Sequence, residues 1–118
     1  MAEDFELDSV TEMSFQIIMS AGDAKGNAIG AMRAANEYKF EEAEKLLSDA
    51  KKSMQEAHHA QTDLMKGEAN GSHVDVNIIL VHSQDHLSMA FTAIDLAEEA
   101  LTINRKLQKL EQMLGGKE

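Results

Sequence analysis

Apolar and small side chains recur at steps of three and four residues in three separate blocks of this chain of 118 residues. Such steps bring side chains onto one face of an α-helix. The blocks cover residues 10–35, 40–65 and 74–114, so we predict three long helices. Long helices joined by short turns favour one all-α domain, an antiparallel up-down-up three-helix bundle spanning residues 1–118.

Polar residues mark the ends of the expected helices. Asn36 lies near the end of the first helix, and Glu41 and Glu42 suit the first turn of the second, where carboxylates complement the helix dipole. The clearest loop is 67–72, which contains two glycines, an asparagine and a serine. We expect His73 to open the third helix as a surface residue.

Three glycines recur at four-residue steps in the first block: Gly22, Gly26 and Gly30. Glycine weakens a helix, so this ridge suggests that a neighbouring backbone approaches closely. A flexible or broken helix is the alternative.

The third block is apolar on two sides. We take one stripe, which includes Asp85, as its main core stripe, and a second set covers much of the remaining surface between residues 74 and 101. A helix that is apolar on two sides needs more partners than a small bundle supplies, so we expect oligomerisation. The first stripe is Val74, Ile78, Val81, Asp85, Ser88, Thr92, Leu96, Ile103, Leu107, Leu110 and Leu114; the second is Val76, Ile79, Leu80, Leu87, Phe91, Ile94 and Leu101.

Composition narrows the function. The formal net charge of -10 disfavours nucleic acid and anionic membranes as partners and suits docking to a basic or mixed-charge protein. The chain has no cysteine, which excludes disulfides, thiol catalysis and cysteine zinc sites. The apolar run 78–81 is too short to span a bilayer. Residues 1–8 lack the layout of a secretory signal, so we expect a cytoplasmic protein. We also expect residues 1–8 to form a flexible N-terminal tail.

A polar insert interrupts the most apolar part of the chain. His82, Asp85 and His86 share one face of the expected helix, whereas Gln84 points elsewhere. We expect this stretch to be buried, and burying two imidazoles and a carboxylate is unfavourable unless they are paired, bound to a metal or chemically active. The insert is therefore the candidate site.

Three interpretations of the insert stay open on the residues alone. His82 and His86 suit a transition metal, although the zinc-protease motif is absent because Ser83 stands where its glutamate would be. The histidines could instead be structural and satisfied by hydrogen bonds. Finally, one imidazole could carry a phosphoryl group as a nucleophile while the other stabilises it.

Asp85 and a second histidine pair need separate explanations. A carboxylate on a core stripe needs a counter-charge, either a lysine or arginine of the same chain or, if copies meet on a symmetry axis, a divalent cation such as Mg²⁺. His58 and His59 lie near the end of the second helix, where either could approach His82, or where one is exposed and one lines an interface.

Three segments carry a family resemblance. Residues 81–87, Val-His-Ser-Gln-Asp-His-Leu, strongly resemble a motif of the lactose/cellobiose-type enzyme IIA proteins of the bacterial phosphotransferase sugar-uptake system. Residues 17–25 and 56–64 are similar to two further segments of that family, in the same order. The resemblance covers roughly residues 10–110 with spacing preserved.

The resemblance implies a fold and a relay. Members are three-helix bundles that assemble as homotrimers. By this resemblance, His82 accepts a phosphoryl group from the phosphocarrier HPr and passes it to a cysteine of the cognate IIB. The membrane permease IIC then delivers a phosphorylated β-linked disaccharide, of the cellobiose, chitobiose or lactose type. Asp85 corresponds to the aspartate that holds a metal on the trimer axis, and His86 is a supporting neighbour in the cleft.

Some positions depart from the family pattern. Tyr38 and Lys39 stand where the family usually has glycine and aspartate before the second helix, and Ser83 replaces a common alanine. Residues 34–43 also have the character of tetratricopeptide-like docking domains. A non-catalytic helical adaptor is therefore the alternative, but it gives no reason for the polar insert. A metal-binding bundle is a third possibility.

Overall fold

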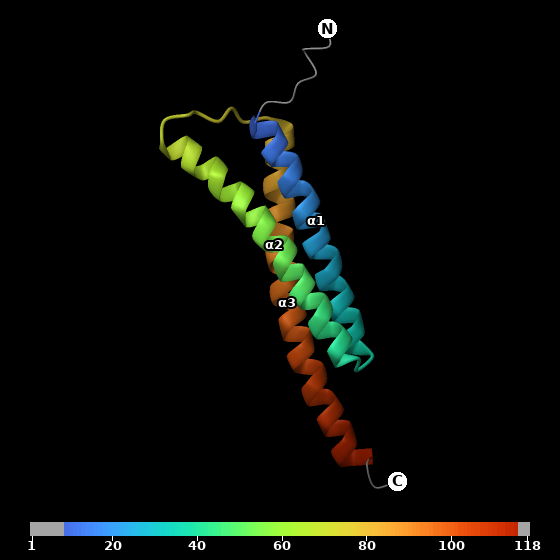
Figure 1. The fold of residues 1–118 in the computed structure, drawn as a ribbon. Helices are drawn as coiled ribbons and strands as arrows, with labels where there is room; N and C mark the ends of the chain where they lie inside the picture. Colours follow the sequence, from blue (N-terminus) through green and yellow to red (C-terminus); the bar gives the residue numbers. More distant parts are fainter. Residues whose placement is uncertain (1–8, 116–118) are drawn as a thin grey trace.

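The computed structural model describes residues 9–115 and consists of three helices: α1 (Ser9–Asn36), α2 (Phe40–Ala69) and α3 (Ile78–Gly115). Helices α1 and α3 run in the same direction and α2 runs in the opposite direction, which confirms the all-α up-down-up bundle (Figure 1). The bundle is elongated, with extents of 72 × 30 × 19 Å. The C-terminal part of α3 continues past the turn between α1 and α2 (Figure 1).

Small side chains form most of the bundle interior. Within residues 9–115, thirteen of the twenty buried hydrophobic residues are alanines. Buried alanine loses no side-chain entropy and allows helices to approach closely. Helix α1 contributes seven of the twenty, Ile17 and six alanines, and packs against both other helices. The C-terminal part of α2 instead veers away from the bundle (Figure 1).

The turn between α1 and α2 is tight. The backbone N–H of Tyr38 donates to the carbonyl of Ala35 at 3.0 Å, and that of Lys39 donates to the carbonyl of Ala34 at 2.9 Å. Tyr38 has φ 60°, the left-handed conformation that favours glycine. This explains the glycine of the family pattern. The Tyr38 ring compensates by stacking on Phe40, with centroids 5.9 Å apart.

The connection between α2 and α3 differs from the prediction. We expected a loop over residues 67–72, but α2 continues to Ala69 and α3 starts at Ile78, so His73 lies in the loop, although it is exposed as expected. The reason is a cap at Asn77, whose side-chain oxygen accepts the Leu80 backbone N–H at 2.8 Å and so fixes the first turn of α3.

The two stripes of α3 have exchanged roles. The second set supplies Leu87, Ile94 and Leu101 to the core of the chain, together with alanines. The supposed main core stripe, including Asp85, is largely exposed. Our expectation that the polar insert is buried is therefore wrong for the single chain. The buried face of α3 combines alanines with Leu87, Ile94 and Leu101, whereas the bulky side chains of the first stripe stay outside the single chain.

The glycine ridge of α1 does not meet another backbone of the chain. A Cβ at Gly22 or Gly26 would find no atom within 4 Å, and at Gly30 it would meet only the Leu46 side chain, at 3.4 Å. The helix is nevertheless continuous through all three, so neither the close approach nor the broken helix is found within the chain.

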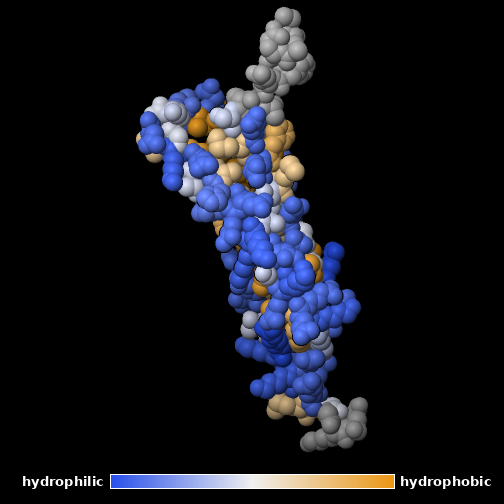
Figure 2. All heavy atoms as spheres, viewed as in Figure 1, coloured by the Kyte–Doolittle hydropathy of each residue, from blue (hydrophilic) through white to orange (hydrophobic). Residues whose placement is uncertain are grey.

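The outward surface is mainly hydrophilic on the side where α2 faces the viewer (Figure 2). None of the helices in residues 9–115 is both long and apolar enough to cross a membrane. The positions predicted as a tail, residues 1–8, lie outside the described part of the chain.

Candidate functional site

His82 and His86 form a pair on the second and third turns of α3. Their Nε2 atoms lie 3.1 Å apart, and the rings meet edge to face with centroids 4.4 Å apart. His82 is exposed and His86 is half-buried. The i, i+4 spacing on a regular helix produces this contact, as the sequence predicted.

The surroundings of His86 favour one tautomer of its imidazole ring. At 3.1 Å, one Nε2 carries a hydrogen and the other accepts it. His86 Nδ1 is buried without a hydrogen-bond partner among the described residues. A buried, unpaired N–H group is less tolerable than an unpaired acceptor. His86 is therefore best described with its hydrogen on Nε2, donating to Nε2 of His82.

Asp85 is separate from the histidine pair. Its side chain is exposed and forms neither a hydrogen bond nor an ion pair within residues 9–115. The alternative of a salt bridge to a lysine or arginine of the same chain is therefore not found within residues 9–115. Asp85 lies on the outward face of α3 among exposed apolar side chains, and those near it include Ile78 and Val81.

Gln84 points away from the histidines, as expected, and it contacts α2. The side-chain amides of Gln84 and Gln61 bind each other in both directions, with N···O distances of 2.8 and 2.7 Å. Gln84 Nε2 also donates to the hydroxyl of Ser83 at 3.2 Å, and that hydroxyl donates to the Leu80 carbonyl at 2.6 Å. Sequence reasoning missed this cluster, although both glutamines stand in segments that carry the family resemblance.

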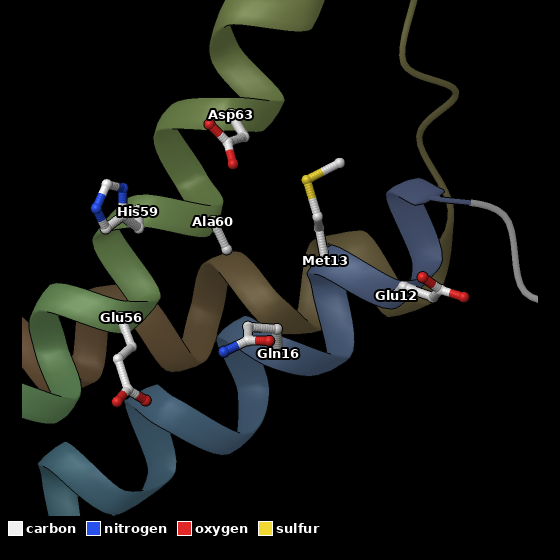
Figure 3. Close-up of a pocket in the computed structure, with 7 residues that line it drawn as sticks. All are labelled: Glu12, Met13, Gln16, Glu56, His59, Ala60 and Asp63. Atoms are coloured by element: carbon white, nitrogen blue, oxygen red, sulfur yellow. The ribbon is translucent and has the colours of Figure 1, made fainter.

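His58 and His59 do not join the site. Both are exposed on α2, and neither contacts His82. The imidazole that His82 contacts is that of His86. His59 lines a groove of about 410 Å³ between α1 and α2, whose acidic members are Glu56 and Asp63 from α2 and Glu12 from α1 (Figure 3). The approach of either histidine to His82 is therefore not found in the single chain, because His58 is exposed on α2 and His59 lines the groove shared with α1.

The described part of the single chain was expected to reveal a metal centre if the two histidines chelate an ion. Across residues 9–115, no group of three or more histidine, cysteine, aspartate or glutamate side chains is arranged to hold an ion. Two paired imidazoles without a third ligand suit nucleophilic chemistry better than chelation. The exposed ring of His82, backed by His86, is accessible to a macromolecular donor, a feature that a purely adaptor role does not require.

Comparison with known proteins places the chain among the components of the bacterial sugar phosphotransferase system. The sequence model for "PTS system, Lactose/Cellobiose specific IIA subunit" matches residues 12–105. The chain belongs to this lactose/cellobiose-specific IIA family. The matched residues include His82, His86, Asp85, Gln61 and Gln84.

Individual relatives agree with this assignment. The chain is 47% identical to the PTS system galactose-specific EIIA component of Lactococcus lactis subsp. cremoris, over 80% of this chain and 82% of the relative. It is 37% identical to the lichenan-specific phosphotransferase enzyme IIA component of Bacillus subtilis, over 85% and 91%. The crystal structure of the PTS cellobiose-specific enzyme IIA from Bacillus anthracis superposes with a TM-score of 0.85 at 34% identity, covering 90% of this chain and 97% of that one.

Proposed function

We propose that His82 is the phosphoryl-accepting residue of this IIA component and that it relays the group from phospho-HPr to a cysteine of the cognate IIB. The observation that carries the proposal is the exposed His82 ring held 3.1 Å from His86 within the matched family segment. As the donor approaches, the His86 N–H would leave the Nε2 lone pair of His82, and this lone pair would attack phosphorus as the phosphorus–nitrogen bond of the donor breaks. The bonding electrons would return to the donor imidazole, which would gain a proton as His82 Nδ1 loses one through solvent.

His86 would support both stages of this reaction. Before transfer, its Nε2–H orients the His82 ring by donating to it. After transfer, the same N–H would donate to a phosphoryl oxygen and stabilise the added negative charge. His86 is thus proposed as a supporting residue, because the new bond forms on His82.

A homotrimer would cover the outward face of α3. Ile78, Val81, Leu96 and Ile103 are each more than half exposed. With Leu107, Leu110 and Leu114, and with the exposed polar residues Asp85, Ser88 and Thr92 between Val81 and Leu96, they follow steps of three, four or seven residues. Such spacing forms a seam between parallel helices. Three seams around one axis would remove these side chains from water.

The same axis would bring three copies of Asp85 together. Their mutual repulsion would be relieved by a divalent cation, and carboxylate oxygens suit a hard ion such as Mg²⁺. The exposed, unpaired carboxylate among apolar neighbours fits this role. We assign the ion a structural role, holding the assembly together, and it takes no part in the transfer step.

The remaining partners follow from the relay. The acidic chain, with a formal net charge of -10, would dock to a basic face of HPr. Through IIB and the permease IIC, it would drive the cytoplasmic delivery of a phosphorylated β-linked disaccharide of the cellobiose, chitobiose or lactose type. Since IIB and IIC contact the sugar, the residues of this chain carry little information about which sugar it is.

Intact-mass spectrometry tests the relay. Incubating the chain with phosphoenolpyruvate, enzyme I and HPr should add one acid-labile phosphate. His82→Asn should add none, His86→Asn should add it slowly, and the matched control His59→Asn should behave as wild type. A wild-type chain that stays unphosphorylated, or a His82→Asn chain that gains the phosphate, would contradict the proposal.

Metal analysis tests the proposed binding of a divalent cation by Asp85 on the trimer axis. Asp85→Leu should remove the bound divalent cation, measured by elemental analysis of the purified chain, and leave a folded oligomer. Leucine suits the apolar seam, so folding should not depend on the ion. Metal content unchanged by the substitution would show that Asp85 is not the ligand.

A further inference from the structure

We propose that Gln61 and Gln84 are positioning residues, which set the rotation of α3 and thereby the direction of the His82 ring. This inference rests on the proposed function of His82. The two side-chain amides bind each other in both directions at 2.8 and 2.7 Å, a geometry with little freedom to slide.

The pair lies where the bundle has few other constraints. Helix α2 diverges from α3 towards its C-terminal end (Figure 1). Of the side-chain contacts between these helices in residues 9–115, Lys51–Glu98 and Arg105–Glu44 lie farther along α3 and are exposed. The amide pair is the tie nearest to His82.

The amides are also well suited to hold one geometry. Both side chains are half-buried, and they line a small cavity of about 210 Å³ together with the apolar Leu64 and Leu80. Partial removal from water strengthens hydrogen bonds and makes an unpaired amide unfavourable. Ser83 adds a further constraint, since its hydroxyl accepts the second hydrogen of Gln84 Nε2 at 3.2 Å. Both hydrogens of the Gln84 amide therefore have an acceptor.

The link to His82 is geometric. Gln84 and His82 are two residues apart, which places them on roughly opposite sides of the helix. Side-chain ends lie about 5–6 Å from a helix axis, so turning α3 by about 10° moves the His82 ring by about 1 Å. A displacement of that size can slow a transfer reaction by roughly 100-fold. Neither glutamine contacts the histidines, so any effect must act through the helix.

The test uses methionine, which keeps the length of the side chain and removes the amide. The variants are Gln61→Met, Gln84→Met and the double variant, and the readout is the rate of His82 phosphorylation by phospho-HPr across donor concentrations. Each single variant should slow the saturating rate by roughly 10- to 100-fold and leave the KM for the donor within about twofold. The double variant should recover the melting temperature, because two apolar groups replace the pair, but not the rate.

Asn104→Ala is the matched control. It removes another amide pair, Asn104 Nδ2 to Asn36 Oδ1 at 2.9 Å, at the far end of the bundle. It should lower the melting temperature without slowing transfer. A wild-type rate in Gln61→Met, recovery of the rate in the double variant, or equal slowing by Asn104→Ala would each overturn the positioning role. If the wild-type chain takes up no phosphate, the proposed function itself fails, a result separate from these.

Discussion

An Ile103→Ala variant should keep its fold but assemble far more weakly than the wild-type chain. Ile103 lies on the outward face of α3 and is 60% exposed in the single chain. Leu101, two residues earlier, points into the bundle and is 8% exposed. Ile103 therefore tests burial between copies of the chain, and Leu101 tests burial within one chain. The two residues lie on the same turn of α3, so their variants can be compared directly.

The size of the effect follows from the exposed fraction. Fully burying an isoleucine side chain contributes about 1.5–3 kcal/mol. Burying the exposed 60% of Ile103 at a trimer axis would contribute about 1–2 kcal/mol per chain, or about 3–5 kcal/mol per trimer. At about 1.4 kcal/mol per factor of ten, the trimer association constant should fall by roughly 10²- to 10⁴-fold.

Sedimentation equilibrium over a range of concentrations measures this change. Ile103→Ala should dissociate at concentrations where the wild type remains assembled, with its helical circular-dichroism signal preserved. Leu101→Ala should instead destabilise the chain itself, by about 2–5 kcal/mol, as a cavity in the core does. An Ile103→Ala variant with the same mass as wild type at every concentration would show that this face is not the seam.

Three smaller predictions concern stability and are measured by chemical denaturation. Gly71→Ala should destabilise the chain by about 1 kcal/mol, because Gly71 has φ +93°; an unchanged stability would contradict the assigned conformation. Gly67→Ala should stabilise it by about 0.5–1 kcal/mol, because the position is inside α2 with open space around its Cβ; a loss would reveal a hidden contact. Asn104→Ala should destabilise by about 1–3 kcal/mol, because it leaves the Asn36 oxygen unpaired, and a neutral effect would mean that water replaces the bond.

The sequence predicted the three helices because their apolar periods are long and no proline interrupts them. The end of α1 at Asn36 and the start of α2 at Phe40 were found correctly, since the acidic first turn of α2 is a local signal. The start of α3 was missed because Val74 and Val76 extend its apolar pattern into the loop. Asn77, three residues before Leu80, was the available signal for the cap.

The site was predictable only where it depends on one helix. The i, i+4 spacing of His82 and His86 led directly to their contact. The pairing of Gln61 with Gln84 depends on the register of two separate helices, which hydrophobic periodicity does not determine. Similarly, the buried face of α3 was misjudged because this helix carries bulky apolar side chains on two sides. Periodicity does not determine which side packs within the chain, and the buried side is the one with Leu87, Ile94 and Leu101.

The alanine interior sets the limits on how this sequence can vary. At Ala21, Ala24 and Ala28 the side chains are fully buried on the helix that contacts both others. A larger residue there would overpack the core and should cost about 1–3 kcal/mol of stability. Diversity among functional variants of this chain should therefore concentrate on exposed positions outside the histidine pair and the proposed seam of α3. Ala21, Ala24 and Ala28 should admit only alanine, glycine or serine, so that this part of the bundle is maintained by its smallest side chains.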